Sequence, residues 1–278
     1  MSGSEKVHVP KSKFYLNKWY LDFISVNGEA MIFYAAQLIW HGVEIPYSSY
    51  MHHKYSGETE QKSGFHINFP KQTNNLVIWN DKDFGIHGTW KKSSEAIHAQ
   101  IFESEKGELN WHCYQPSSIT ELEIQGKKRK GTGYVEQLII TIPVWVIPMD
   151  ELRWGHVVSE KHKIVWIELK GGNTNRWLWL NGELMKNYNI KDDLIFIYDK
   201  NFRIYFDRNT VLESEKKLTS LANKLKRFIP GIKNLIPINF LLADECKWFS
   251  KVTIEVNNKI VENGFSIHEF VNFKPLSD

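Results

Sequence analysis

The chain has 278 residues and a mass of 32.7 kDa, enough for one large β domain or two ordinary ones. Hydrophobic residues make up 42% and charged residues 24%, and no 18-residue apolar run occurs, which excludes a transmembrane helix and argues against disorder. The net charge of +3 is too small to support nucleic-acid binding. The short basic run 127–130 is interpreted as a solvated turn between strands.

Aromatic residues are unusually frequent, with 11 Trp, 11 Tyr and 16 Phe in the chain. The Trp content is roughly three times an average share. Such a composition fits either a strongly aromatic core or an aromatic-lined cavity, and composition alone leaves both open.

Cysteines and the N-terminus favour a cytoplasmic protein. Cys113 and Cys246 are far apart, which argues against a disulfide framework and a zinc ribbon. Residues 1–12 are polar and lack the apolar stretch of a secretory signal.

In chain order, period-two segments dominate the first part of the sequence. Residues 20–24 and 31–39 flank Asn27-Gly28, a strong hairpin signal. Further strands are expected at 76–79, 86–90, 97–102, 109–114, 119–124 and 134–142. Their spacing of about ten residues predicts an antiparallel barrel or sandwich.

The pattern restarts after residues 143–149, an apolar stretch with two prolines that we interpret as an extended link. Strands are expected at 152–158, 164–169, 177–180, 194–198, 202–206, 251–256 and 260–268. Residues 213–228 have helical periodicity and predict an amphipathic helix against a barrel wall. The predicted domains are two β halves, 1–145 and 146–278, with helix 213–228 in the second.

Common catalytic motifs are absent from the sequence: it contains no nucleophile elbow, phosphate loop, dinucleotide fingerprint or His-Glu-x-x-His. The histidines show no metal-ligand spacing, so we expect neither a metal nor a cofactor.

A carboxylate on an apolar strand face is the most informative feature. Tyr134 and Glu136 are two residues apart and share that face with Leu138 and Ile140. A buried carboxylate must be either paired or protonated, since burying an unpaired charge is unfavourable. A protonated acid beside a tyrosine would be a good general acid, whereas an ion pair between Glu136 and Arg153 would be structural.

Several short motifs resemble the lipocalin-like superfamily of carotenoid 1,2-hydratases and AttH-type hydrolases. They are Trp19-Tyr20-x-Asp22-Phe23, Gly133-Tyr134-Val135-Glu136, the 143–148 stretch, Leu152-Arg153-Trp154-Gly155 and Gly264-Phe265-Ser266-Ile267-His268-Glu269. The resemblance implies an all-β fold of two calycin-like antiparallel barrels. Its members include carotenoid hydratases, kievitone hydratase-like enzymes and lipocalin-like pericyclases.

The family's tyrosine-x-acid pair falls on Tyr134 and Glu136, although the carotenoid hydratases have Asp at the second position. Their upstream His-x-Trp pair is replaced here by adjacent Trp111 and His112, only one of which can face a shared cavity. The resemblance implies catalytic roles for Glu136, Tyr134 and His112, and substrate-binding roles for Trp111, Trp154, Arg153 and His156.

Three functions remain open. The first is a lyase, isomerase, cyclase or hydrolase that uses a buried carboxylic acid on a hydrophobic, terpenoid- or polyketide-like substrate in a barrel cavity. The second is a non-catalytic carrier of a hydrophobic ligand, and the third is a structural β protein whose Trp residues only form the core. Each reading involves neither nucleic acid nor stable membrane insertion, and the oligomeric state stays open.

Overall fold

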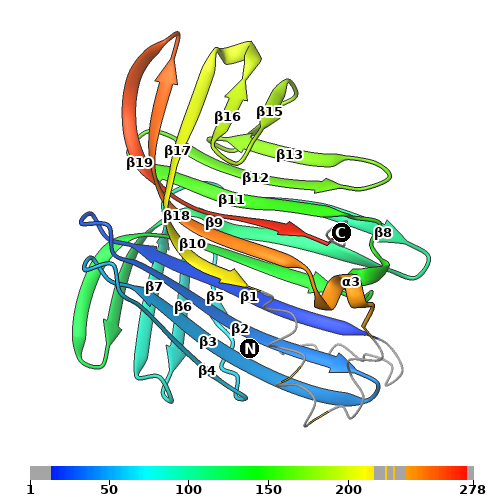
Figure 1. The fold of residues 1–278 in the computed structure, drawn as a ribbon. Helices are drawn as coiled ribbons and strands as arrows, with labels where there is room; N and C mark the ends of the chain where they lie inside the picture. Colours follow the sequence, from blue (N-terminus) through cyan, green and yellow to red (C-terminus); the bar gives the residue numbers. More distant parts are fainter. Residues whose placement is uncertain (1–13, 216–222, 224–227, 229–235, 274–278) are drawn as a thin grey trace.

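The computed structural model describes residues 14–215, 223, 228 and 236–273, which form two antiparallel sheets of ten and nine strands (Figure 1). Both sheets curl, so that the fold is all-β with two barrel-like halves, as the sequence predicts. The first sheet comes from the N-terminal part of the chain and the second from the C-terminal part.

The first sheet has the order β4-β3-β2-β1-β10-β9-β7-β6-β5, and β8 also pairs with β9. The predicted hairpin at Asn27-Gly28 joins β1 to β2, and Gly28 has the positive φ (84°) that this turn requires. The strands are β1 (Tyr15–Ile24), β2 (Ala30–Trp40), β3 (Val43–His53), β4 (Thr59–Gly64), β5 (Lys71–Gln72), β6 (Leu76–Asp81), β7 (Ile86–Lys92), β8 (Ile97–Ser104), β9 (Gly107–Ile124) and β10 (Lys127–Ile140).

One long strand replaces two predicted ones. The sequence predicts separate strands at 109–114 and 119–124, but β9 runs without interruption through Pro116. The register between β9 and β10 shifts on either side of Val135, so Pro116 falls at a bulge where the ladder needs no N–H from it. The strand therefore continues through the proline.

The second sheet has the order β14-β13-β12-β11-β19-β18-β17-β16-β15. Its strands are β11 (Glu151–Ser159), β12 (Lys163–Lys170), β13 (Asn175–Leu180), β14 (Glu183–Leu184), β15 (Tyr188–Ile190), β16 (Leu194–Ile197), β17 (Phe202–Glu215), β18 (Asp244–Val256) and β19 (Lys259–Asn272). Two 3₁₀ turns, η1 (Val144–Val146) and η2 (Tyr198–Lys200), and the short helix α3 (Ile238–Leu241) complete the described elements.

The connection between the sheets is anchored by aromatic contacts. It contains the turn η1 and is therefore not extended throughout, because its backbone turns between Pro143 and Pro148. Trp145 packs against Trp40 and Phe14, with ring centroids 5.1 and 6.0 Å apart. We propose that this connection separates the two domains expected from the sequence, 1–145 and 146–278.

The start of the predicted helix at 213–228 is a β-strand in the structure. Its first three residues, 213–215, belong to β17, because that strand pairs with β18 as far as Glu215. The rest lies outside the described residues except for Asn223 and Phe228. The Phe228 ring packs on Phe65 at 4.8 Å.

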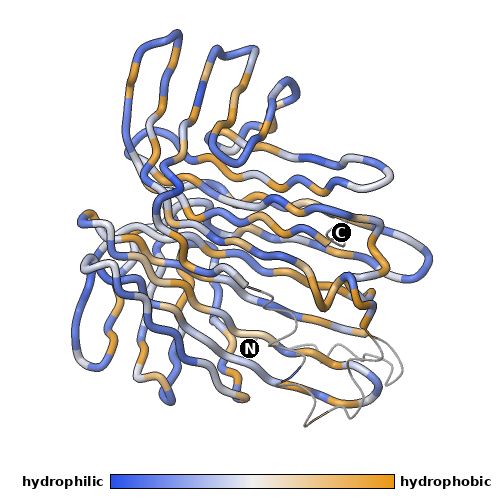
Figure 2. Tube along the Cα trace, in the orientation of Figure 1, coloured by the Kyte–Doolittle hydropathy of each residue, from blue (hydrophilic) through white to orange (hydrophobic). Residues whose placement is uncertain are grey.

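Period-two alternation gives the central strands two buried faces. In β1, Trp19, Leu21 and Phe23 pack into the core of the first half, whereas Tyr20 and Ile24 face the other way. In Figure 2, hydrophobic and hydrophilic residues alternate along many of the strands. The opposite faces form a core shared by both sheets, called the inter-sheet core below: Tyr20, Ile24, Ala30, Ile32, Tyr34, Met51, Ile97, Ile101, Trp111, Cys113, Tyr134, Trp154, Val165, Ile167, Leu169, Trp179, Leu212, Phe249 and Ile267.

Candidate active site between the two sheets

Glu136 lies in the inter-sheet core, with 5% of its surface exposed. Three donors converge on its Oε2 atom: Trp111 Nε1 at 2.6 Å, Tyr134 OH at 2.7 Å and Trp154 Nε1 at 3.1 Å. Trp111 comes from β9 and Trp154 from β11, so the carboxyl group joins the two sheets. The sequence predicts that the Glu136 carboxyl group lies inside a barrel cavity, but in the structure it lies between the two halves.

Glycines let the strands approach each other closely at this site. A Cβ atom on Gly133 would lie 2.4 Å from the carbonyl oxygen of Asp22 on β1. A Cβ atom on Gly155 would lie 2.4 Å from the Trp166 ring on β12. Both distances are shorter than any real contact, so the glycines that precede Tyr134 and follow Trp154 are required by packing.

Burial raises the pKa of Glu136. The hydrogen bonds from Tyr134 and Trp111, the positive charge of Lys18 and the hydrogen bond from Trp154 act in the opposite direction, but burial outweighs them. The carboxyl group is thus held closer to its protonated form than a carboxyl in water, while its conjugate base has donors already in place.

Arg153 is not the partner of Glu136. Its guanidinium donates to Asp192 at 3.0 Å and to Glu151 at 2.8 Å, and lies over the Phe270 ring at 4.5 Å. The neighbouring residue Trp154 points to Glu136, so Arg153 must point to the other face of β11. The structural ion pair considered for Glu136 is therefore wrong.

His112 also lies away from the carboxyl group. Trp111 faces Glu136, and His112 on the opposite face of β9 contacts His98 Nδ1 through its own Nδ1 at 3.0 Å. Burial and the nearby His98 lower the pKa of His112. Of the adjacent pair, Trp111 is the member that belongs to the site.

His156 pairs with a second buried carboxylate and contacts Tyr134 of the site. Its Nε2 atom lies 2.6 Å from Asp22 Oδ2, and both side chains are fully buried. The His156 ring stacks on Tyr134, with centroids 4.3 Å apart and planes 11° apart. The site thus holds Tyr134, Glu136, Trp111, Trp154 and His156 together.

Sequence reasoning overlooked three members of the site. Tyr20 packs edge-on to Trp154 at 4.9 Å, and Trp179 stacks on Trp111 at 5.2 Å. Asp22 lies between Tyr20 and Ile24 on one face of β1. An acidic residue on an otherwise apolar strand face is the same pattern that identified Glu136. That pattern could have found Asp22.

A buried lysine forms a second polar contact between the halves. Lys247 Nζ is 2.7 Å from Glu269, 3.3 Å from Glu213 and 2.9 Å from the Tyr34 hydroxyl in the first sheet. Burial alone would lower the pKa of Lys247, but the neighbouring acidic groups hold it well above its usual value. These contacts stabilise the lysine as a cation.

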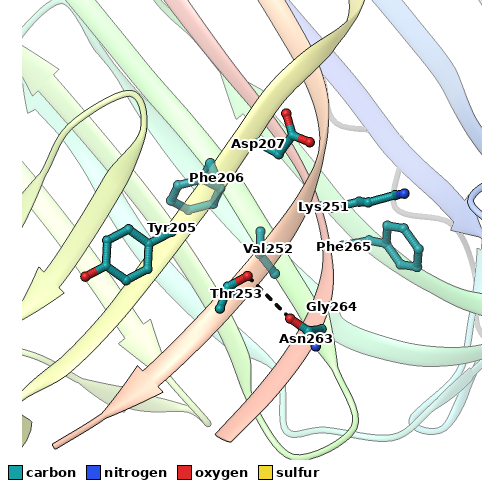
Figure 3. Close-up of a pocket in the computed structure, with 9 residues that line it drawn as sticks. All are labelled: Tyr205, Phe206, Asp207, Lys251, Val252, Thr253, Asn263, Gly264 and Phe265. Atoms are coloured by element: carbon teal, nitrogen blue, oxygen red, sulfur yellow. Dashed lines mark hydrogen bonds between the residues drawn. The ribbon is translucent and has the colours of Figure 1, made fainter. Parts of the chain in front are cut away.

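An open hollow of about 570 Å³ lies over β17, β18 and β19 (Figure 3). Lys251 and Phe265 extend to the same side of these strands in Figure 3. The Phe265 ring stacks on Phe249 at 5.3 Å and packs against the inter-sheet core. The hollow therefore borders the core that contains Glu136.

One group within the described part of the chain has metal-ligand geometry: His66, Asp81 and Asp83 place ligand atoms within 4.8 Å of one another. The carboxylate of Asp81 is already engaged in hydrogen bonds. Its Oδ2 atom bonds to His66 Nε2, and its Oδ1 atom accepts the backbone N–H groups of Asp83 and Phe84. These bonds account for the group as a turn of the first sheet. Over the residues described, we find no helix with the length and apolarity needed to cross a bilayer.

The fold and site define a double β-barrel protein with a buried carboxyl group between its halves. No protein-family profile matches the chain, and no curated protein sequence matches it. Solved structures do resemble it.

A protein of Nitrosomonas europaea described as an AttH aligns with a TM-score of 0.53 and 7% identity over 99% of both chains. Kievitone hydratase from Nectria haematococca aligns with a TM-score of 0.53 and 13% identity, over 92% of this chain and 88% of the hydratase. CghA aligns with a TM-score of 0.50 and 7% identity, over 93% and 88%. The chain therefore has the lipocalin-like fold of the AttH and carotenoid hydratase type.

Proposed function

We propose that this protein is an enzyme that acts on an apolar small molecule between its two sheets, with Glu136 as the general acid. The observation that carries the proposal is the buried carboxyl group whose Oε2 atom accepts three hydrogen bonds in aromatic surroundings. A carrier of apolar ligands gains little from such a group, because burying it is unfavourable. The shared fold with a hydratase is consistent with this assignment.

The hydrogen bonds fix which carboxyl oxygen carries the proton. Trp111, Tyr134 and Trp154 all donate to Oε2, so in the protonated form of Glu136 the proton would be carried by Oε1. Transfer of this proton to a substrate alkene or carbonyl leaves a carboxylate. The three donors stabilise that carboxylate without rearrangement, as preorganised donors do for other developing anions.

Aromatic rings stabilise the cation that protonation creates. Trp154 is flanked edge-on by Tyr20 at 4.9 Å and Tyr134 at 5.8 Å, and one face of Trp111 is covered by Trp179. A cation over a desolvated indole face gains roughly 1–2 kcal/mol. Trp111 and Trp154 therefore hold the substrate and stabilise its developing positive charge.

A terpenoid- or polyketide-like substrate fits this chemistry, since it is apolar and carries an alkene or carbonyl to protonate. Hydration and cyclisation are the reactions we favour, because both begin with that proton transfer. The hollow beside Phe265 borders the inter-sheet core, and we propose it as the side from which such a molecule approaches.

The test compares the wild type with Glu136→Gln, both purified from the source cells. Glutamine can accept the same hydrogen bonds through its amide oxygen but has no proton to transfer. We expect native mass spectrometry to detect a molecule retained by the variant. The wild type should convert that molecule when it is added, with a product resolved by chromatography.

Glu168→Gln is the matched control, because Glu168 is as buried as Glu136 but pairs with Arg153 on another part of the sheet. This control should convert the molecule normally. If the wild type and Glu136→Gln both release the molecule unchanged, the protein is a carrier and the proposed catalysis is wrong.

A further inference from the structure

Asp22 and His156 form a fully buried pair that joins β1 of the first sheet to β11 of the second. The Asp22 Oδ2 atom lies 2.6 Å from His156 Nε2 and also accepts the Tyr20 hydroxyl at 3.2 Å. The Asp22 backbone carbonyl accepts Trp90 Nε1 at 2.7 Å. Asp22 is thus fixed at both ends, and it orients the imidazole ring.

The pair leaves two polar atoms without a protein partner. Within the described residues, neither His156 Nδ1 nor Asp22 Oδ1 has a hydrogen-bond partner, although both are buried. Buried polar groups in proteins are normally paired, because an unpaired one is destabilising by about 1–3 kcal/mol. Such atoms between two sheets are where a bound molecule would find a proton acceptor.

The unpaired nitrogen belongs to a ring that contacts the same tyrosine as the acid. Tyr134 stacks on His156 at 4.3 Å and donates its hydroxyl to Glu136 at 2.7 Å. Trp154, two residues before His156 on β11, shares its face and donates to Glu136 as well. His156 and Glu136 therefore flank one aromatic patch.

We propose that His156 is the general base of this site and that Asp22 positions it, so that one bound molecule meets a proton acceptor and a proton donor. His156 keeps its proton on Nε2, which donates a hydrogen bond to Asp22, and accepts a second proton at Nδ1. In a hydration, water loses a proton to Nδ1 and its oxygen bonds to carbon, while the proton from Glu136 bonds to the neighbouring carbon. Proton exchange with solvent then restores neutral His156 and protonated Glu136. The pairing with a proton donor rests on the function proposed above for Glu136.

Nitrocyclohexane tests the base separately from the acid. It is an apolar carbon acid, and removal of its C1–H proton moves the electron pair into a nitronate that needs no proton donor. Exchange of this hydrogen for deuterium in D₂O is followed by proton NMR. We expect the wild type to exceed an equal concentration of free imidazole by about 10²-fold, the lower range for general-base catalysis.

Three variants separate the roles. His156→Gln keeps a donor for Asp22 but has no basic nitrogen, and it should lose the acceleration. Glu136→Gln should retain most of it. Asp22→Asn should lower the maximal rate and leave the apparent KM nearly unchanged. The substitution disturbs the orientation of the base, whereas the aromatic surface that binds the molecule stays in place.

A second measurement reports on the His156 ring in the wild type directly. Long-range ¹H–¹⁵N NMR of histidine-labelled protein, with His156→Gln used for assignment, should show a neutral ring with hydrogen on Nε2 and a bare Nδ1. Asp22→Asn should alter this tautomer. A ring with its hydrogen on Nδ1 and a bare Nε2 would overturn the proposal.

The exchange assay can also overturn it. If Glu136→Gln abolishes exchange while His156→Gln retains it, Glu136 is the base and the assignment is wrong. An acceleration no greater than that of free imidazole would equally exclude a basic nitrogen within reach of an apolar molecule. Loss of turnover in Glu136→Gln alone, with exchange intact, concerns only the acid and leaves His156 as the base.

Discussion

Two substitutions separate the hydrogen bonding of Glu136 from its charge. Glu136→Gln keeps an oxygen that can accept Trp111, Tyr134 and Trp154, whereas Glu136→Leu removes the acceptor from all three. A buried donor left unpaired is destabilising by about 1–3 kcal/mol, so three amount to about 3–9 kcal/mol. Leucine regains about 1.5–3 kcal/mol by apolar burial. At the midpoints of these ranges the net loss in the leucine variant is about 4 kcal/mol.

Urea unfolding followed by tryptophan fluorescence measures this difference, provided that the m values agree. The glutamine variant should lie within about 2 kcal/mol of the wild type near neutral pH. A leucine variant as stable as the glutamine variant would refute the reasoning, because the three donors would then contribute nothing to the fold.

The pH dependence checks the charge. Burial raises the pKa of Glu136 above its ordinary value of 4.5, so the folded protein retains a proton that the unfolded chain has lost. The stability that protonated Glu136 contributes, measured as the difference in unfolding free energy between the wild type and Glu136→Gln, is therefore complete at a pH below the pKa of Glu136 in the unfolded chain. It should decrease as the pH rises through the folded pKa, and a difference that increases with pH would contradict the assigned shift.

Three further outcomes follow from single residues. Burial lowers the pKa of His268 to about 3, so protonation of the unfolded chain should reduce stability by about 2 kcal/mol between neutral pH and pH 5 in urea titrations. His268→Gln should remove that dependence, and an unchanged slope would contradict it. Lys247→Met removes the buried cation that pairs with Glu269 and Glu213 and should lower the unfolding free energy by about 3–5 kcal/mol; an unchanged midpoint would show that the cluster is not stabilising. Gly133→Ala places a Cβ atom 2.4 Å from the Asp22 carbonyl, and by overpacking should lower stability by about 1–3 kcal/mol in thermal melts; a neutral effect would mean that β1 and β10 separate easily.

Local chemistry was sufficient to predict much of the fold. Period-two alternation predicted the strands and the Asn27-Gly28 turn predicted the first hairpin, whereas the two β-barrel halves were implied by the resemblance that the short motifs carry. The interruption predicted near residue 116 was wrong, because a proline is accommodated where a bulge removes the need for its N–H. The predicted start of the helix at Glu213 was also wrong, because pairing with β18 extends β17 through that residue.

The site was predicted only in part. Tyr134 and Glu136 were predicted to share a face because they are two residues apart in a strand, and in the structure the Tyr134 hydroxyl donates to Glu136. The ion pair with Arg153 was wrong, because neighbouring residues of a strand point to opposite faces and Trp154 takes the one that faces Glu136. The contact between Asp22 and His156 spans 134 residues of sequence, and no local pattern specifies such a contact.

The sequence by itself determined an aromatic-rich, all-β chain with one carboxyl group on an apolar strand face. Only the tertiary structure decided that this face lies between two barrels, where it meets Trp154 and His156 of the second sheet. The reason is that alternation shows which residues share a face but not which face is the barrel interior when both are buried. Composition left open an aromatic core or an aromatic-lined cavity; in the structure the rings of the inter-sheet core pack together, and Trp111, Tyr134 and Trp154 of that core surround Glu136.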